Sequence, residues 1–255
     1  MKIEGKVAIV TGGASGLGGA TVRLLHSAGA KVIIADTNRN AGNNLSLALG
    51  SRVSFIETDV TSDRSTQSVF NKSLKSHKAL HILVNCAGVA IAKKIISKEI
   101  PHDLSKFRQV IDVNLVGTFN ALRLGGAAMA SNVPNREGER GVIINTSSVS
   151  AFEGQIGQAA YAASKAGVAG LTLPASRELA RHGIRVVTIA PGIFDTPLMA
   201  GLPEKARDSL AQQVPFPSRL GRPEEFAALV AHIIENVMLN GETVRLDGAL
   251  RMAPR

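Results

Sequence analysis

Three side chains able to move a proton stand close together in the middle of the chain. Tyr161, the only tyrosine, is followed four residues later by Lys165 and preceded thirteen residues earlier by Ser148. On a helix, residues four apart lie on one face, so the phenol and the ammonium would share one space. A neighbouring cation favours the phenolate and lowers the phenol pKa from its usual value of about 10. The three side chains therefore predict acid–base chemistry on a substrate alcohol or carbonyl, with the serine hydroxyl binding the same oxygen.

This spacing alone also fits a structural interpretation. A tyrosine and a lysine four residues apart are more often a core side chain and a solvated one, and Ser148 would then be a turn residue. The chemical interpretation is favoured only if another part of the chain supplies a hydride carrier, because a phenol by itself performs no redox reaction.

The N-terminal region has the pattern of a unit that binds such a carrier. An apolar strand at 7–10 leads into the sequence TGGASGLG at 11–18, which is followed by a helix at 20–27 and a strand at 31–35. Glycines at 12, 16 and 18 allow a tight turn and close approach to a pyrophosphate, which the helix N-terminus attracts. We therefore expect Gly12, Gly16 and Gly18 to lie at a dinucleotide. A flexible surface turn is the alternative.

The residue after the second strand bears on the choice of dinucleotide. Asp36 can accept hydrogen bonds from an adenosine ribose and would repel a 2′-phosphate. The loop has no basic residue at Ala14 or Ser15, which also favours NAD over NADP, although Arg39 lies close by. Asp36 is otherwise a simple turn residue at a strand end.

Strands and helices alternate along the rest of the chain. We expect strands at 53–57, 81–84, 142–145, 184–189 and 243–246, and helices at 40–49, 61–75, 107–129, 159–181 and 224–235. The pattern predicts an α/β fold, a Rossmann-type doubly wound parallel sheet of six to seven strands with helices on both faces. No linker or internal repeat is apparent, so residues 1–255 should form a single NAD-binding catalytic domain. The stretch 198–220, rich in proline, is a candidate lid.

Composition restricts the class of protein. The chain has 255 residues, a net charge of +9, six histidines and one cysteine, Cys86. The histidines show no metal-ligand spacing, and Cys86 is more typical of a small buried residue than of a nucleophile. No apolar run approaches a membrane span, so we expect a soluble intracellular protein. The positive charge would suit a phosphate-bearing substrate or nucleic acid, or it reflects surplus surface lysine.

Six features in order resemble the short-chain dehydrogenase/reductase family: TGGASGLG, NCAG at 85–88, Asn114, Ser148, YAASK at 161–165 and Pro191-Gly192. The resemblance covers the whole chain. It implies a catalytic set of Asn114, Ser148, Tyr161 and Lys165. In it the tyrosine is the acid–base, and the serine binds the substrate oxygen. The lysine lowers the tyrosine pKa and binds the nicotinamide ribose, while the asparagine holds a water that relays protons.

The same resemblance implies further contacts with NAD. Ser15 and Leu17 belong to the pyrophosphate loop, Asp36 meets the ribose, and Asp59 and Val60 meet the adenine. Two more positions complete this set: Cys86, which stands where most family members have asparagine, and Phe194, which follows the Pro-Gly turn beside the nicotinamide amide.

A narrower likeness is also visible. The segments 141–167, 215–221 and 240–252 resemble the type-2 3-hydroxyacyl-CoA dehydrogenases, also described as type 10 17β-hydroxysteroid dehydrogenases. This implies NAD-dependent interconversion of short-chain L-3-hydroxyacyl-CoA and 3-ketoacyl-CoA in fatty acid metabolism by a homotetramer. The location would be cytoplasmic, or the mitochondrial matrix for a eukaryotic source. Three lysines of the segment 91–104 would either meet CoA phosphates or form a solvated face: Lys93, Lys94 and Lys98.

Two other functions stay open. The same chemistry could act on a steroid or another secondary alcohol. The charge of +9 and the tRNA-processing complex of animal relatives also suggest an RNA-associated scaffold. An intact catalytic set argues against nucleic acid as the primary partner, because a scaffold would not need it.

Overall fold

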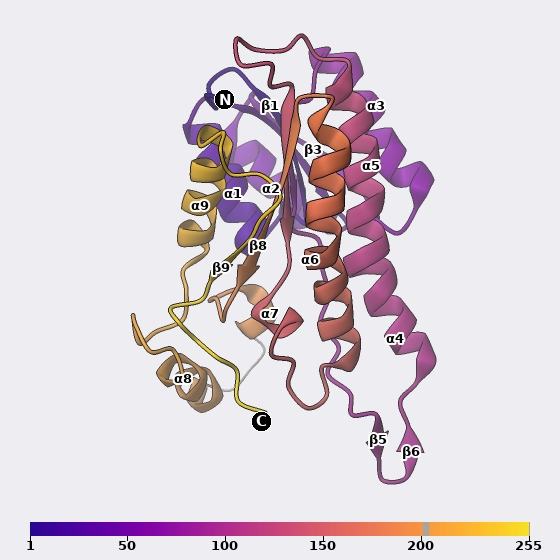
Figure 1. The fold of residues 1–255 in the computed structure, drawn as a ribbon, viewed down its shortest axis with the longest axis vertical. Helices are drawn as coiled ribbons and strands as arrows, with labels where there is room; N and C mark the ends of the chain where they lie inside the picture. Colours follow the sequence, from indigo (N-terminus) through magenta and orange to yellow (C-terminus); the bar gives the residue numbers. More distant parts are fainter. Residues whose placement is uncertain (201–203, 255) are drawn as a thin grey trace.

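The centre of the structure, a computed structural model that describes residues 1–200 and 204–254, is a seven-stranded parallel sheet (Figure 1). Its strands lie in the order β3 (Val53–Glu57), β2 (Lys31–Asp36), β1 (Val7–Thr11), β4 (Ile82–Asn85), β7 (Gly141–Thr146), β8 (Ile184–Pro191) and β9 (Thr243–Leu246). Each strand pairs in parallel with its neighbours. The predicted doubly wound sheet is therefore confirmed.

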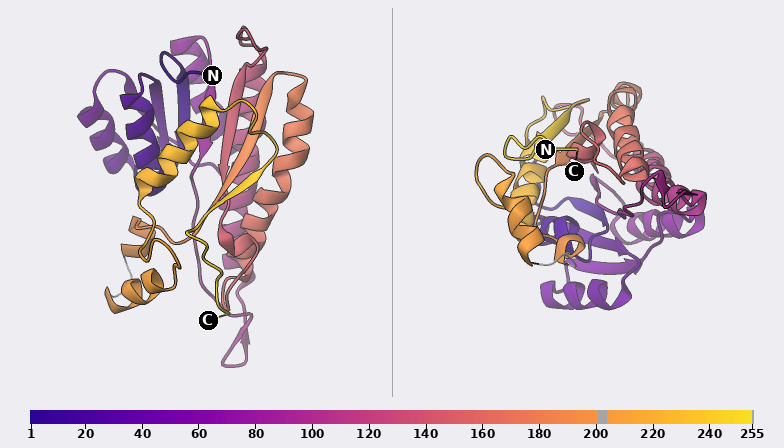
Figure 2. Two further views of the ribbon diagram at one scale, coloured as in Figure 1. Left: turned by 60° about the vertical axis from the view of Figure 1, so that its left-hand side comes forward. Right: turned by 90° about the horizontal axis from the view of Figure 1, so that it is seen from below.

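Helices cover both faces of this sheet, as the view along it shows (Figure 2). One face carries α1 (Gly16–Ser27), α2 (Arg39–Leu49) and α9 (Pro223–Glu235), and the other carries α3 (Asp63–His77), α4 (Leu104–Ile111), α5 (Gly117–Ala130) and α6 (Ala159–Ala180). Strand residues alternate between the two layers, since Ala8 and Val10 join the core beneath α1 while Val7 and Ile9 join the core beneath α5. A strand that is buried on both faces must be apolar at every position, which is why β1 is an unbroken apolar run.

The strand order sets where a ligand can bind. From β1 the chain proceeds to β2 and β3 on one side, and then returns to β4 on the other side of β1. The loops that leave β1 and β4 therefore diverge at the carboxyl edge of the sheet, and ligands of open α/β sheets bind in the crevice that forms there. This edge is the lower end of the molecule in Figure 1.

Two segments differ in detail from the predicted elements. The helix expected at 107–129 consists of α4, a π-helical segment η1 (Asp112–Val116) and α5. The loose stretch after β4 contains a small hairpin of β5 (Ile96–Ser97) and β6 (Ile100–Pro101), which projects from the carboxyl edge (Figure 1). Neither feature was predicted, because a π turn and a two-residue strand leave almost no periodic signal.

The predicted lid segment lies beside the glycine-rich loop. It contains α7 (Pro197–Ala200) and α8 (Glu204–Gln212), while residues 201–203 of that prediction lie outside the described residues. A methyl group added at Gly16 would lie 3.5 Å from Cδ of Pro197. The chain that enters α7 therefore rests against the loop between β1 and α1.

The described part of the chain has no helix with the length and apolar character needed to cross a bilayer. Nor does it bring three or more His, Cys, Asp or Glu side chains together in a way that could hold a metal ion.

Candidate active site

Tyr161, Ser148 and Lys165 come together at the carboxyl end of β7. Because α6 begins at Ala159, Tyr161 and Lys165 share one face of its first turns. Ser148 precedes the short 3-10 turn η2 (Val149–Ala151), and its side chain lies near enough to the Tyr161 phenol to lower the pKa of that group. The Lys165 ammonium nitrogen lies 5.7 Å from the centre of the tyrosine ring. The fold therefore assembles the three side chains with which the sequence analysis began.

Lys165 is a buried ammonium with a single described acceptor. The side chain is 5% exposed, and Nζ donates a hydrogen bond of 2.8 Å to the carbonyl oxygen of Thr146 at the end of β7. Burial lowers the pKa of Lys165 to about 8, because the charged form loses solvation. The Ser147 hydroxyl donates to the Lys165 carbonyl at 2.7 Å and so fixes this turn of α6 to the strand.

The phenol of Tyr161 differs from the prediction in the direction of its pKa shift. Burial raises the pKa of Tyr161, and the hydrogen bond from Ser148 lowers it by less. The expected lowering by Lys165 is therefore wrong for the protein without ligands, because the cost of burying a phenolate exceeds the effects that favour it. At neutral pH the phenol keeps its proton.

Asn114 lies inside the π-helical segment and is fully buried. Its Oδ1 accepts from the Val89 amide at 2.8 Å, and its Nδ2 donates to the Val89 carbonyl at 2.9 Å and to the Ser164 hydroxyl at 3.0 Å. A methyl group at Gly88 would lie 3.3 Å from Asn114 Oδ1 and 3.6 Å from Lys165 Nζ. Asn114 thus joins the loop after β4 to α6 and lies beside Lys165.

The glycine-rich loop is packed so closely that side chains are excluded. A Cβ at Gly12, where φ is +63°, would lie 2.7 Å from the Ala87 amide nitrogen, and a Cβ at Gly18 would lie 2.2 Å from the Gly12 carbonyl oxygen. Ser15 is the N-cap of α1, yet its side chain makes no capping bond, and Leu17 is half-buried against the core. The first amides of α1 are therefore available to an anion.

Asp36 is held against this loop. Its carboxylate accepts from the Ala14 amide at 3.0 Å and from the Asn38 amide at 2.9 Å. Arg39, the cation that left NADP open, is paired with Glu57 on the neighbouring strand, with Nε donating to Oε2 at 2.9 Å. The carboxylate is therefore ordered at the end of β2, while the nearby arginine is engaged elsewhere.

Asp59 and Val60 follow β3 at the same edge. Asp59 is exposed and accepts from the Thr61 amide at 2.9 Å. Val60 is buried, and a methyl group at Gly117 of α5 would lie 2.6 Å from its Cγ2. The side chain of Val60 thus packs against α5, while its carbonyl oxygen accepts from Thr66 and Asn120 at 3.4 Å each.

The remaining two predicted cofactor residues, Cys86 and Phe194, contribute little side-chain polarity. Burial raises the pKa of the Cys86 thiol to about 11, and its sulfur accepts a weak hydrogen bond of 3.6 Å from the Thr146 hydroxyl. This thiol is protonated at neutral pH and is a poor nucleophile. Phe194 is 7% exposed, and its ring fills the space beside Gly221.

A row of polar side chains beneath the site was missed in the sequence analysis. Thr11, Asn85 and Asn145 are in register at the ends of β1, β4 and β7. The Thr11 hydroxyl donates to Asn85 Oδ1 at 3.4 Å, and Asn85 Nδ2 donates to Asn145 Oδ1 at 2.9 Å. A polar residue at the end of three successive parallel strands was the available signal. The sequence carries no signal for the Thr146 carbonyl, which accepts the hydrogen bond from Lys165, because every residue has a backbone carbonyl.

Lys93, Lys94 and Lys98 lie on or beside the projecting hairpin, and all three are exposed. The Lys93 amide donates to the Gly157 carbonyl at 2.9 Å, so the base of the hairpin is joined to the loop that precedes α6. The structure thus places these lysines at the carboxyl edge of the sheet, the edge at which Tyr161 also lies.

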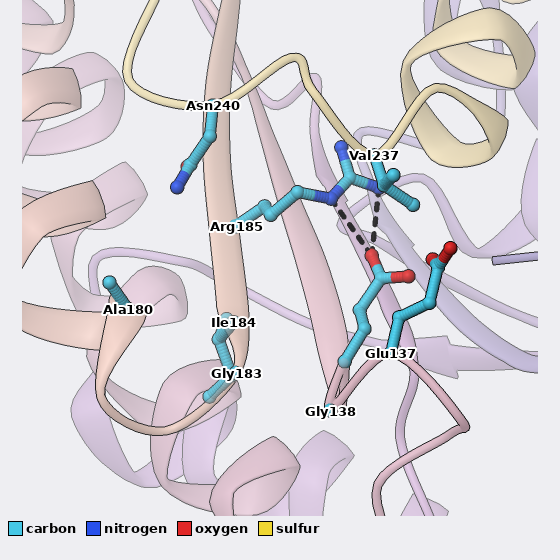
Figure 3. Close-up of a pocket in the computed structure, with 9 residues that line it drawn as sticks. Glu137, Gly138, Ala180, Gly183, Ile184, Arg185, Val237 and Asn240 are labelled. Atoms are coloured by element: carbon cyan, nitrogen blue, oxygen red, sulfur yellow. Dashed lines mark hydrogen bonds and ion pairs between the residues drawn. The ribbon is translucent and has the colours of Figure 1, made fainter.

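A cavity of about 390 Å³ lies elsewhere, at the amino ends of β7 and β8 (Figure 3). Arg185, which lines this cavity, forms an ion pair of 2.8 Å with Glu139 and donates to the carbonyls of Ile233 and Ile234 at the end of α9. These groups satisfy one another and cap a helix, so the cavity has a structural explanation. Ser148, Tyr161 and Lys165 lie at the opposite edge of the sheet.

Known proteins resemble this chain along most of its length. The family model described as short chain dehydrogenase matches residues 6–207. The 3-hydroxyacyl-CoA dehydrogenase type-2 of Drosophila melanogaster is 52% identical over 254 residues, which cover 99% of this chain and 100% of that protein. The Homo sapiens enzyme of the same name is also 52% identical, with 99% of this chain and 97% of that protein covered.

A solved structure also has the same fold. The crystal structure of 3-hydroxyacyl-CoA dehydrogenase type-2 from Mycobacterium avium superposes with a TM-score of 0.93 at 44% identity, and 98% of each chain is covered. The resemblance inferred from the motifs is therefore confirmed over the full length of the chain.

Proposed function

The chain belongs to the short-chain dehydrogenase family of oxidoreductases, and from this premise we propose that it interconverts short-chain L-3-hydroxyacyl-CoA and 3-ketoacyl-CoA with NAD. The observation that supports the reaction is the grouping of three side chains: Ser148 lowers the pKa of the Tyr161 phenol, and the Lys165 ammonium lies 5.7 Å from the centre of the tyrosine ring. The substrate class is supported by the names of the relatives that share half of the sequence.

The residues present fit a dinucleotide. The backbone cradle at Gly12, Gly16 and Gly18 would hold the pyrophosphate with Ser15 and Leu17 at the start of α1, because a Cβ at Gly12 or Gly18 would collide with backbone. Asp36 would accept hydrogen bonds from the adenosine ribose, and its charge would oppose a 2′-phosphate. Further contacts would come from Asp59, Val60, Cys86, Phe194 and Lys165.

The protein residues would then handle the proton. NAD⁺ supplies the hydride acceptor when it is bound. The Ser148 hydroxyl donates to the substrate oxygen and orients it. Tyr161 exchanges a proton with that oxygen, and its raised pKa favours the acid role that ketone reduction requires at neutral pH.

Lys165 and Asn114 would connect the phenol to solvent. The Lys165 ammonium favours the phenolate when Tyr161 has given up its proton. Both amide hydrogens of Asn114 are used by Val89 and Ser164, so a relay water would bind at one of its oxygens.

One experiment tests the substrate class. The purified protein is mixed with NADH, and absorbance at 340 nm is followed with acetoacetyl-CoA, a panel of ketosteroids and small ketones. We expect the highest kcat/KM with acetoacetyl-CoA. A higher value for a ketosteroid would refute the acyl-CoA assignment while leaving the reaction type intact.

We also propose where the CoA part of the substrate binds. Lys93, Lys94 and Lys98 would meet the phosphates of CoA, because they are exposed on the side of the sheet that carries Tyr161. The matched substrates are acetoacetyl-CoA and its pantetheine analogue, which lacks the CoA phosphates. Neutralising the three lysines should raise KM for the first and leave KM for the second unchanged.

Assembly and location remain proposals. We propose a homotetramer of single-domain subunits spanning 1–255, because three apolar side chains on the same helical layer are about half exposed: Val116 of η1, Phe119 of α5 and Leu173 of α6. Light scattering at micromolar concentration tests the tetramer. The compartment, cytoplasmic or the mitochondrial matrix, stays a prediction.

A further inference from the structure

A partly buried ion-pair network lies beside the segment that joins Ser148 to Tyr161. Its centre is Arg245 on β9, which reaches Glu153 across 92 residues of sequence. Nη1 donates to Glu153 Oε1 at 2.9 Å, Nη2 donates to Oε2 at 3.1 Å, and Nε donates to Asp247 at 2.7 Å. A fork of this kind has strict geometry, because the guanidinium is planar and the carboxylate is bidentate.

The network also holds the C-terminal segment 249–254 in place. Arg245 Nη2 donates to the Leu250 carbonyl at 2.9 Å, and the Met252 amide donates to Glu153 at 3.1 Å. Further contacts join the C-terminal segment to residues that precede Tyr161. The Ile156 amide donates to the Pro254 carbonyl at 3.1 Å, and Gln155 Nε2 donates to the Ala253 carbonyl at 2.9 Å. The segment 149–158 is therefore bound to the C-terminal segment over several residues.

At its other end, the network contacts the segments that contain Gly192 and Phe216. Asp247 packs against Gly192, where an added Cβ would lie 2.9 Å from the Asp247 Cα. The Phe216 amide donates to the Gly248 carbonyl at 3.3 Å, in the stretch that follows α8. The network thus connects the Ser148–Tyr161 segment to the chain around Phe194 and to the predicted lid.

We propose that Arg245 is a positioning residue, which acts through Glu153 to hold the segment 149–158 and the C-terminal segment 249–254 as one wall of the substrate site. Arg245 is 23% exposed and Asp247 is 8% exposed at the side chain, so the fork is shielded from solvent more than a surface ion pair is. Lysine would keep the charge, but a single ammonium cannot reproduce the fork. The inference rests on the proposed function for its kinetic test only.

The kinetic test compares R245Q, R245K and E153Q, with R123Q as a control that removes the distant ion pair between Arg123 and Asp63. The substrate is the panel compound with the highest wild-type kcat/KM. We expect R245Q to raise its KM at least fivefold, with kcat and the Kd for NADH within twofold of wild type. KM of R245K should lie between the values for wild type and R245Q, and KM of R123Q should equal that of wild type.

A double variant tests the route of the effect. If Arg245 acts through Glu153, KM of R245Q/E153Q equals that of R245Q within twofold. Two results would overturn the proposal. In the first, the increase in KM of the double variant equals the product of the increases in R245Q and E153Q. In the second, KM of R245Q stays within twofold of wild type although its Tm is lower.

A second measurement needs no substrate and so separates this inference from the proposed function. Amide hydrogen exchange of the peptide covering 149–158 should be at least threefold faster in R245Q than in wild type and R123Q. Unchanged exchange there refutes the positioning role. Absence of turnover with every panel compound, together with faster exchange, would refute the proposed function and leave the positioning role supported.

Discussion

Replacing Lys165 by methionine should stabilise the protein while it removes activity. Burial lowers the pKa of Lys165 from 10.5 to about 8. This difference of about 2.5 units, at about 1.4 kcal/mol per unit, corresponds to a penalty of about 3–4 kcal/mol for the buried ammonium at pH 7. The hydrogen bond from Nζ to the Thr146 carbonyl, worth about 1 kcal/mol, is lost in the variant. The net gain in the free energy of unfolding is therefore about 2–3 kcal/mol.

The gain should depend on pH with a definite sign. Between about pH 8 and pH 10.5 the unfolded chain binds the Lys165 proton and the folded chain does not, so wild-type stability from this group rises with pH. Below about pH 8 both states are protonated and the full penalty applies. The advantage of the methionine variant should consequently shrink from pH 7 to pH 10. Measurements stop at pH 10, because the raised pKa of Tyr161 destabilises the folded state above it.

Urea unfolding followed by circular dichroism at pH 7, 8.5 and 10 provides the measurement. The control is Lys72→Met on α3, where the side chain is exposed and the substitution should change stability by less than about 0.5 kcal/mol. In parallel, we expect the Lys165→Met variant to lose at least a hundredfold in kcat. A wild type that is more stable than the variant at pH 7, or a difference that is equal at all three pH values, would refute a penalised buried ammonium.

Four further predictions concern the site. Tyr161→Phe should abolish turnover with the NADH Kd within twofold by fluorescence titration, and a variant that keeps most of its rate contradicts the acid–base role. Asp36→Ala should lower the NAD to NADP ratio of kcat/KM, and an unchanged ratio excludes Asp36 as the selector. Alcohol oxidation should rise from pH 7 to pH 10, because burial raises the pKa of Tyr161 and only the phenolate accepts a proton; a flat pH–rate profile argues otherwise. Asn114→Ala should lower the free energy of unfolding by about 1–3 kcal/mol in urea, because the partly buried Val89 amide and carbonyl lose their partners, and an unchanged Cm contradicts this.

The order and type of the main elements could be predicted from the sequence. The seven strands of the sheet were each predicted to within two residues at either end. For the inner strands the reason is that a strand buried on both faces must be a short apolar run between turn residues, whereas the edge strands β3 and β9 are only partly buried. The glycine-rich loop could be placed for a similar reason, since Gly12 and Gly18 stand where a Cβ would collide with backbone.

The sequence by itself also determined which side chains can do chemistry, because the spacing of Tyr161 and Lys165 on a helix is a local property. Only the tertiary structure decided the electrostatics, since the raised pKa of Tyr161 and the lowered pKa of Lys165 both come from burial by distant segments. It alone also paired Arg245 with Glu153, because contacts between residues 92 apart depend on how helices and strands pack and leave no periodic trace in the chain.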